Sequence, residues 1–372
     1  MTTLDTIVVG GGPAGLATSR ELARAGAAHV VLERGAGVGH TWANLYDSLV
    51  LHTGKHLSAL PGMPFPRGTP LFPARRDFLT YLERYAETFR VPLEAGADVA
   101  AAARGNGGWV VRTASGAELR ARTLVFATGI VANPQVPFIP GRERFRGAVL
   151  HSVEYRRPDP HRDRSVLVVG AGNSAGEIAS ELAAAGARVT LAVRSGARVV
   201  PRELLGIPIQ YFAVALSPLP LAAQQTIQGL IDRLGATMRG RPPLPPPRAG
   251  RCSDVPLIGF QLADALRMGT IALKPGAAEF TECGIRFDDG SIGEFETVML
   301  ATGYRAAVGP LGDAIRIDPC GFAVRRGRVA SADQPGLCFV GHNYDTRGGL
   351  RNIAQDARLA AKAVVKALAS DP

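Results

Sequence analysis

The hydrophobic pattern of the chain shows the same order of elements twice. Near the N-terminus, Thr6–Val9 and His29–Leu32 are short β-branched and apolar runs, as in strands that are buried on both faces. Ala14–Ala25, between them, has the apolar spacing of a helix. The order recurs within Ser165–Arg194, as the strand SVLVVG, the helix AGEIASELAAAG and the strand VTLAV. Two β-α-β units this far apart predict an α/β protein with two doubly wound, Rossmann-like domains.

Weaker patterns fill the rest of the chain. A helix is expected over Arg76–Thr88, and strands are expected around Trp109–Thr113 and Thr123–Ala127. The apolar stretch Tyr211–Ala236 predicts a helix, and the proline-rich RGRPPLPPPRAG after it predicts a stiff surface loop. The C-terminal helix has its apolar positions at Leu350, Ile353, Ala357, Ala361, Val364 and Leu368.

The first glycine run follows the first strand and opens the first helix. Gly10, Gly12 and Gly15 fit the pattern G-x-G-x-x-G, with Pro13 and Ala14 between them. Glycines allow a tight turn and let the backbone approach a pyrophosphate at the helix N-terminus. Glu33 ends the next strand, where a carboxylate accepts hydrogen bonds from ribose hydroxyls. We therefore expect a dinucleotide with an unphosphorylated ribose at this turn.

The second glycine run differs at the ribose position. It contains Gly170, Gly172, Asn173, Ser174 and Ala175. Arg194 takes the place after the second strand that Glu33 has in the first unit, with Ser195 beside it. A guanidinium binds a 2′-phosphate bidentately, whereas a carboxylate repels it. The alternative is a solvated surface arginine. The pattern favours NADPH over NADH at this turn.

This asymmetry predicts FAD at the first turn and NADPH at the second, with hydride transfer between them. Two further strands, in LVFATGIVANP and VMLATGY, end in Ala127-Thr128-Gly129 and Ala301-Thr302-Gly303. Each is expected to be a crossing of the chain between the two domains, with the first run contacting FAD and the second contacting NADPH. The strand GLCFVGH (336–342) leads to the C-terminal helix, whose N-terminus is expected to face the flavin's pyrimidine edge.

Composition excludes several other classes of protein. The formal net charge is +10, but the arginines are scattered among acids without an aromatic-interleaved stripe, so nucleic acid is not an expected partner. Cys252, Cys283, Cys320 and Cys338 form no C-x-x-C pair, which argues against a metal site or a redox dithiol. Without a basic signal region or an apolar run of membrane-spanning length, the expected location is the cytoplasm, with no membrane partner.

The segment FRGAVLHSVEY (145–155) matches F-x-G-x-x-x-H-x-x-x-Y at Phe145, Gly147, His151 and Tyr155. That pattern identifies flavin-containing monooxygenases, whose order of motifs the chain also resembles. Tyr155 stands where Baeyer–Villiger relatives usually have Trp. The chain is most similar to the YUCCA-type branch, which converts indole-3-pyruvate to indole-3-acetate. That similarity lies in YDSLVLHTGKHLSALPGMPFP (46–66), RVVPRELLGIP (198–208) and FDDGSIGEFETVMLATGY (287–304).

The resemblance implies a mechanism. NADPH reduces FAD, O2 adds at flavin C4a, and the (hydro)peroxide transfers one oxygen atom to a small organic substrate. The substrate is a 2-oxo acid that loses CO2, as in the YUCCA branch, or a specialised metabolite that is hydroxylated or oxygenated at N or S. A flavin reductase that passes electrons to a partner is the alternative from another class. A homodimer is a candidate assembly.

The domain and site predictions follow from these motifs and the resemblance. The FAD domain is expected at 1–155 and 302–372, with the NADPH domain, 156–301, inserted into it and a substrate-entrance segment at about 205–267. His52 stands where animal-type members carry a flavin-side Asn, so we expect it beside the flavin. His151 and Tyr155 are expected to hold the link between the domains or to border the nicotinamide. Besides the first glycine turn, Glu33 and the first Ala-Thr-Gly, the expected FAD contacts are Arg34, Thr41, Trp42, Val99, Gly341, His342 and Leu350.

Overall fold

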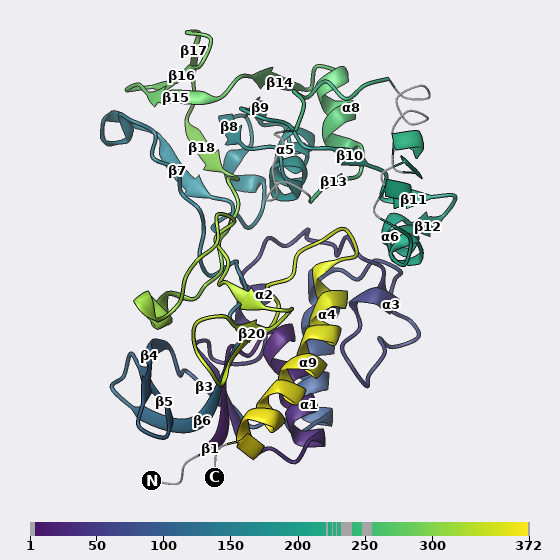
Figure 1. Ribbon diagram of the computed structural model, residues 1–372. Coiled ribbons are helices and arrows are strands. Elements are labelled where there is room, and N and C mark those ends of the chain that lie inside the picture. The colour runs from purple at the N-terminus through teal and green to yellow at the C-terminus, as the bar shows by residue number, and fades with distance from the viewer. Residues whose placement is uncertain are drawn as a thin grey trace. The chain divides into compact units, whose positions relative to one another are not determined.

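The chain forms two compact units in a computed structural model that describes residues 4–220, 222–224, 226–227, 229–231, 240–247 and 255–370 (Figure 1). Unit 1 consists of the described parts of Met1–Asn133 and Tyr304–Pro372. Unit 2 consists of the described parts of Pro134–Gly303. The second unit is therefore an insertion in the first, as the order of the motifs predicts.

A twisted sheet with a parallel centre forms the middle of unit 1. Its strand order is β19-β20-β21-β6-β1-β2-β3, and β4 and β5 extend β6 as an antiparallel meander. The strands β21, β6, β1, β2 and β3 all run parallel to their neighbours. The bounds are β1 Leu4–Val9, β2 His29–Glu33, β3 Leu93–Ala95, β4 Val99–Gly105, β5 Gly108–Thr113, β6 Glu118–Phe126, β19 Arg325–Arg326, β20 Ala330–Ser331 and β21 Leu337–Phe339.

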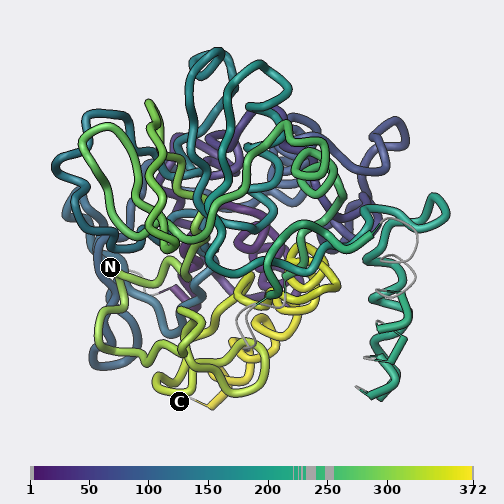
Figure 2. Tube along the Cα trace, turned by 90° about the horizontal axis from the view of Figure 1, so that it is seen from above, coloured from purple at the N-terminus to yellow at the C-terminus, as the bar shows by residue number. Residues whose placement is uncertain are grey.

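Three helices cover one face of this sheet: α1 (Pro13–Arg24), α4 (Arg75–Thr88) and α9 (Gly349–Ser370). Figures 1 and 2 both show α9, in yellow, beside α1, in purple. The sheet has a hydrophobic core on each face, and alternate residues of β1 belong to different cores. Val8 packs under the helices, while Ile7 and Val9 pack on the other face. Short helices α2 (His40–Ala43) and α3 (Lys55–Ser58) and the 3-10 turn η3 (Gly309–Ala314) lie in its loops.

Unit 2 is built on a five-stranded parallel sheet of order β14-β9-β8-β18-β7. Helices α5 (Asn173–Ala184) and α8 (Gln261–Arg267) pack together beside it, and a small antiparallel sheet of β15, β16 and β17 shares its other core. The strands span β7 Ala148–His151, β8 Ser165–Val169, β9 Arg188–Ala192, β14 Ile271–Lys274, β15 Ala277–Phe280, β16 Gly284–Phe287, β17 Ile292–Glu294 and β18 Thr297–Leu300, with 3-10 turns η1 Arg142–Arg144 and η2 Asp159–His161. Two Rossmann-like sheets are thus present.

The two chain crossings between the units lie side by side. The Arg305 amide donates to the Asn133 carbonyl at 2.9 Å, and the Gln135 amide donates to the Gly303 carbonyl at 2.9 Å. The unit boundaries at 133/134 and 303/304 differ from the expected 155/156 and 301/302. The first difference arises because β7 pairs with β18 and so belongs to the sheet of unit 2.

The segment after β9 departs from the expected long helix over Tyr211–Ala236. It contains β10 (Val199–Val200), which pairs with β13 (Leu257–Ile258), the hairpin of β11 (Glu203–Leu204) and β12 (Ile207–Pro208), and then α6 (Ile209–Leu216). Helix α6 ends at Leu216, before Pro218 and Pro220, because a proline ring cannot continue the helical hydrogen bonds. The described residues from 222 to 231 are helical again, so the predicted helix is present but interrupted, and its end lies outside the described residues.

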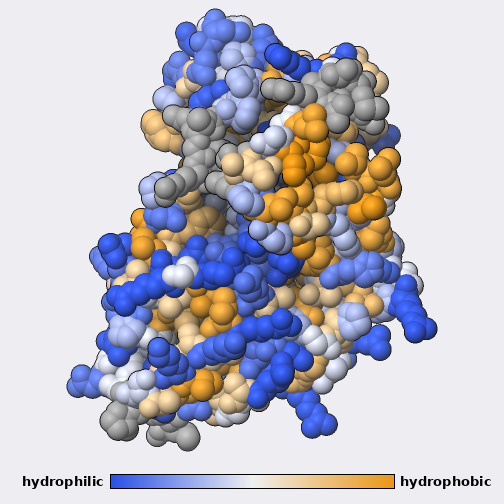
Figure 3. All heavy atoms as spheres, turned by 45° about the vertical axis from the view of Figure 1, so that its right-hand side comes forward, coloured by the Kyte–Doolittle hydropathy of each residue, from blue (hydrophilic) through white to orange (hydrophobic). Residues whose placement is uncertain are grey.

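Figure 3 shows apolar side chains gathered on a face that carries α6 and the β11–β12 hairpin. Leu205, Ile207, Leu219 and Leu230 are the exposed large hydrophobics of this segment. The proline-rich stretch, as far as it is described, runs over Gly196, where Pro247 forms a parallel bridge. No helix among the described residues is long and apolar enough to cross a membrane.

Candidate functional site

The first glycine turn has room for a ligand at one glycine and none at the two others. A Cβ on Gly10, whose φ is +109°, would approach the Ala127 carbonyl oxygen to 2.7 Å, and a Cβ on Gly15 would collide with the Gly10 carbonyl. Nothing lies within 4 Å of a Cβ on Gly12, which precedes α1. No side chain caps α1, and its first turn has no acidic residue. Free amides facing open space suit a pyrophosphate, so the turn fits a dinucleotide.

Glu33 lies beneath this turn, and its carboxylate is held by two backbone amides. Gly11 donates to Oε2 at 2.7 Å and Gly35 donates to Oε1 at 2.8 Å. The side chain is buried, so these amides replace the water that the charge loses. Each carboxylate oxygen can accept a second hydrogen bond, so Glu33 remains able to bind ribose hydroxyls.

Two helix N-termini meet beside Gly341. A Cβ on Gly341, whose φ is +83°, would lie 3.1 Å from the Ala14 Cβ in the first turn of α1 and 3.6 Å from Ile353 in the first turns of α9. The short approach explains why glycine is required after β21. It also places the partial positive charges of two helix N-termini at the same edge of the sheet. An extended ligand with more than one electron-rich group fits this edge.

The other expected FAD residues fall into two groups. Trp42 and Thr41 lie on α2, where Trp42 packs edge-on against Phe78 with ring centroids 4.6 Å apart, and Arg34 is exposed after β2. His52 and Leu350 are half-buried. By contrast, the side chains of Val99 and His342 point into protein. Val99 packs in the core of β4–β6, and the His342 ring stacks on Phe339 at 5.5 Å.

The second glycine turn repeats the geometry of the first. Gly170 has a φ of +130°, and its Cβ would collide with the Ala301 carbonyl, as that of Gly10 approaches the Ala127 carbonyl. Gly172 precedes α5 with φ −81° and ψ −177°, against −83° and −173° for Gly12, and nothing lies within 4 Å of its Cβ position. Each Ala-Thr-Gly thus supplies the carbonyl behind the first glycine of its unit. Gly129 and Gly303 both have positive φ.

The second turn differs from the first in two side chains. Ala175 takes the place of Gly15 and is fully buried, so α5 leaves space for a methyl group where α1 does not. Asn173, expected as an NADPH contact, donates its Nδ2 to the Pro256 carbonyl at 3.0 Å, and its Oδ1 accepts from the Ile258 amide at 2.8 Å. The Asn173 side chain therefore holds β13 against the start of α5.

Arg194 and Ser195 follow β9, which ends at Ala192. Arg194 is exposed and forms no ion pair with any residue in the described part of the chain. The side chain of Arg194 packs beside Gly276. A Cβ on Gly276 would lie 3.3 Å from the Cβ of Arg194. A cation at this place, one strand from the second glycine turn, suits a phosphate on the ribose.

The signature segment 145–155 has a structural reason at each of its four positions. A Cβ on Gly147 would collide with the Phe145 ring, which packs on Phe280 with centroids 5.3 Å apart. His151 ends β7, and its Nδ1 accepts from the Val153 amide at 3.2 Å. Burial lowers the pKa of His151, with opposing effects from the Gly303 carbonyl and Glu154.

Tyr155, the last signature residue, is buried and donates its hydroxyl to Glu181 of α5 at 3.0 Å. Burial and the nearby Glu181 carboxylate raise the pKa of the Tyr155 hydroxyl. The hydroxyl is thus a structural donor to α5. His151 lies where the chain leaves unit 2 through Gly303.

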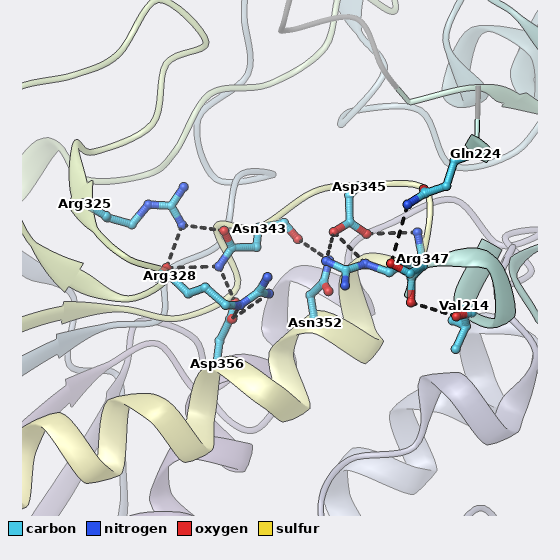
Figure 4. A network of polar contacts seen from close by, with 10 residues as sticks. Val214, Gln224, Arg325, Arg328, Asn343, Asp345, Arg347, Asn352 and Asp356 are labelled. Carbon is cyan, nitrogen blue, oxygen red and sulfur yellow. Dashed lines mark hydrogen bonds and ion pairs between the residues drawn. The ribbon is translucent and has the colours of Figure 1, made fainter. Parts of the chain in front are cut away.

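Sequence reasoning missed a polar cluster in unit 1. Figure 4 shows Arg325, Arg328, Asn343 and Asp356 joined by hydrogen bonds and an ion pair. Asp356 is fully buried although it lies on the apolar side of α9, close to Ile353 and Ala357. A lone carboxylate within an apolar helical stripe was the signal that could have revealed it. No group of His, Cys, Asp and Glu that could hold a metal ion is present among the described residues.

Comparisons with known proteins agree with this site. The family model "Pyridine nucleotide-disulphide oxidoreductase" matches residues 7–202. Indole-3-pyruvate monooxygenase YUCCA1 of Oryza sativa subsp. japonica is 37% identical over 81% of this chain and 77% of its own length. YUCCA4 of the same plant is 36% identical over 97% of this chain and 87% of its own length.

A solved structure shows the same fold. The flavin-containing monooxygenase from Stenotrophomonas maltophilia superposes with a TM-score of 0.78 at 24% identity, covering 98% of this chain and 99% of that one. With two glycine turns of matching geometry, a signature segment between them and curated relatives above 35% identity, the chain belongs to the flavin-containing monooxygenases of the YUCCA type, a family of FAD- and NADPH-dependent oxidoreductases.

Proposed function

We propose that this monooxygenase acts on a 2-oxo acid such as indole-3-pyruvate. The reaction would consume one 2-oxo acid, NADPH, a proton and O2, and would release the shortened acid, CO2, NADP+ and water. The support for this substrate class is that the curated relatives which align with most of this chain are named indole-3-pyruvate monooxygenases. The 46–66 segment, which resembles that branch, lies in unit 1, where Thr53 packs beside Gly348 before α9.

The observation that carries the two cofactor sites of this proposal is the pair of glycine turns, one followed by Glu33 and the other by Arg194. In unit 1, the turn at Gly12 would hold the FAD pyrophosphate, and Glu33, already fixed by two amides, would bind a ribose. In unit 2, the turn at Gly172 would hold NADPH, and Arg194 would bind its 2′-phosphate. Bound FAD supplies the redox chemistry and the activation of O2.

The chain's own contribution is binding, orientation and the exclusion of water. Backbone amides at the two helix N-termini would bind the pyrophosphates of both dinucleotides. The 46–66 segment is fixed on α4: the Tyr81 hydroxyl accepts from the Leu60 amide at 2.8 Å and donates to the Met63 carbonyl at 2.7 Å. The Tyr85 hydroxyl donates to the Pro61 carbonyl at 2.7 Å. In the proposed site, this fixed loop would exclude water from the reacting groups.

The proposed residue roles include those that remain predictions from the sequence. His52 would lie on the flavin side within the fixed loop, and His151 and Tyr155 would hold the link of unit 2. The exposed apolar residues Leu205, Ile207 and Leu219 of the predicted entrance segment suit a substrate with an apolar body. A cytoplasmic location and a homodimer stay expectations of the same kind.

Oxygen-18 labelling tests the proposed reaction. We expect purified protein with NADPH, 18O2 and indole-3-pyruvate to give indole-3-acetate with one 18O atom in its new carboxylate, together with CO2 and one NADP+ per product. Gly172→Ala is the matched control, because it should remove NADPH oxidation while FAD stays bound. A panel of amines and thioethers run in parallel tests the alternative substrates.

Other outcomes would contradict the proposal at different levels. Label in an N-oxide or sulfoxide, with none in the acid, would retain the monooxygenase and overturn the 2-oxo acid. Stoichiometric hydrogen peroxide, with no labelled product from any compound of the panel, would instead favour the reductase alternative.

A further inference from the structure

The carboxylate of Asp356 is fully buried, and both of its oxygens have partners. Arg328 donates its Nε to Oδ1 at 2.9 Å, and its Nη2 lies 2.9 Å from the same oxygen. Asn343 donates its Nδ2 to Oδ2 at 2.7 Å. Burial raises the pKa of Asp356, while Asn343 and Arg328 oppose the shift. A buried ion pair of this kind contributes little to stability by itself, so its position calls for another reason.

Asn343, two residues after Gly341, is the centre of the network (Figure 4). Its Oδ1 accepts from Arg325 Nη1 at 3.0 Å, and its Nδ2 also donates to the Arg328 carbonyl at 3.1 Å. Its backbone carbonyl accepts from Asn352 Nδ2 at 2.9 Å. Asn352 and Asp356 of α9 therefore hold the first residues of the loop between β21 and α9. The β19–β20 turn, through the Arg328 carbonyl, contacts Asn343 there as well.

Asp345 holds the other end of the loop, where it also contacts Asn352 of the network. Asp345 accepts from the Arg347 amide at 2.9 Å and from Arg347 Nη2 at 2.5 Å. Gly348 has a φ of +99°, and its Cβ would lie 2.9 Å from Thr53 Oγ1 in the loop that carries His52. The network thus sets where α9 begins relative to Gly341, α1 and the His52 loop.

We propose that Asp356 is a positioning residue for bound FAD, which acts by fixing the start of α9 through Asn343. The inference rests on the proposed FAD site at the Gly12 turn. Asp356 does not touch the cofactor. It keeps the N-terminal end of the α9 dipole at one place, so the favourable potential at the flavin edge depends on the network.

Asp356→Asn tests this role, with Asp333→Asn as its matched control. Asp333 forms a 2.7 Å ion pair with Arg316 in the same unit and, among the described residues, no hydrogen bond to the loop between β21 and α9, so Asp333→Asn makes the same chemical change outside the network. The readouts are the dissociation constant of FAD from titration of the apoprotein, the midpoint potential of bound FAD and the binding of NADP+ to unit 2. We expect Asp356→Asn to raise the dissociation constant of FAD by about 10- to 100-fold and to make the midpoint potential of bound FAD more negative. Asp333→Asn should change neither.

Two further variants separate positioning from charge balance and from misfolding. Asp356→Asn with Arg328→Gln removes both charges of the ion pair. If only charge balance mattered, FAD affinity and potential would return to wild type, which would overturn the inference. Arg325→Gln removes the hydrogen bond from Arg325 to Asn343 but leaves Asp356 paired with Arg328. It should weaken FAD and shift its potential with no loss of thermal stability, and an unchanged FAD affinity and potential would contradict the role even if Asp356→Asn does not fold.

The result for wild-type protein keeps the two proposals distinguishable. If wild-type apoprotein does not bind FAD, the proposed site fails. If it binds FAD and Asp356→Asn binds it equally well at an equal potential, only the positioning role fails.

Discussion

Gly12 and Gly172 occupy equivalent positions in the two units, and each has open space where a methyl group would project. Gly12→Ala should therefore leave the fold intact and fill the space that the FAD pyrophosphate requires. We expect purified Gly12→Ala to contain little FAD, while NADP+ still binds unit 2. Gly172→Ala should show the reverse, with full FAD content and a raised KM for NADPH. Loss of both nucleotides in either variant would contradict the assignment of one nucleotide to each turn.

Arg194 is the residue on which the choice of NADPH depends. Arg194→Ala should lose one charge-assisted contact, which costs about 1.5–3 kcal/mol, and should weaken NADPH far more than NADH. Arg188→Ala is the control, because Arg188 is also exposed but lies at the opposite end of β9. Steady-state KM values for both coenzymes measure the effect, and an equal loss for NADPH and NADH would overturn the assignment.

His342 makes a prediction about acid stability. Burial, with a smaller effect of Arg325, lowers the pKa of His342 to about 3. Below pH 6.5 the unfolded chain takes up a proton at this histidine and the folded chain does not, so stability falls as the pH falls from 6.5 toward 3. The loss is about 1.4 kcal/mol per pH unit.

His342→Gln removes this proton uptake, so its unfolding free energy should fall by about 2 kcal/mol less between pH 7 and pH 5 than that of wild type. Denaturant unfolding at the two pH values measures the difference. Parallel curves for the two proteins would show that folding does not lower the pKa of His342.

At the residue scale, the sequence predicts backbone roles better than side-chain roles. The positions of the glycines, Glu33 and Arg194 in a strand-turn-helix unit could be predicted, because they follow from a local pattern, and their nucleotide contacts stay predictions. The side chains of Asn173 and His342 could not, since Asn173 bonds to Pro256 and Ile258, and His342 packs on Phe339. Whether a polar side chain faces a ligand or its own protein depends on contacts distant in sequence.

At the scale of elements, the β11–β12 hairpin contains a strained turn. Its two central residues, Leu205 and Gly206, have φ values of +52° and +74°. Leucine is unfavourable in this left-handed region by roughly 1–2 kcal/mol, whereas Asn-Gly is preferred in such a turn. Leu205→Asn should therefore raise the thermal stability of the protein, and Leu205→Ala is the control that removes the apolar side chain without relieving the strain. Equal melting temperatures for the two variants would contradict this reading.

The same scale shows where pattern reasoning fails. The strands and helices of both β-α-β units were predictable, because buried parallel strands and amphipathic helices have strong local periodicity. The predicted helix over Tyr211–Ala236 is interrupted after α6, because Pro218 and Pro220 break it and hydrophobicity alone does not report that break; the described residues from 222 to 231 are helical again. Strand β7 gave no signal, since it has four residues and pairs with β18, far along the chain.

For the whole molecule, the adjacent crossings make the insertion separable. Asn133 and Arg305 are hydrogen-bonded neighbours, so removing 134–303 and joining the ends with a short Gly-Ser linker should leave unit 1 able to fold. We expect the joined protein to bind FAD, and residues 134–303 alone to bind NADP+ without FAD. Calorimetric titration of each half measures this. A folded half that no longer binds its nucleotide would show that its site needs the other half.

The sequence predicts the insertion itself but not its limits. Two glycine turns and two Ala-Thr-Gly runs give the order of the units, since each run lies next to its own turn. The boundary near 133 depends on which sheet β7 joins, and that pairing is visible only in three dimensions.

The neighbouring crossings have a consequence for the origin of the enzyme. An insert whose two ends leave the host at one point needs no rearrangement of the host chain, so a single recombination event could have added it. The same arrangement would let the coenzyme module be exchanged between relatives as a cassette. Preference for one nicotinamide coenzyme could then change during evolution without any alteration of the flavin-binding host.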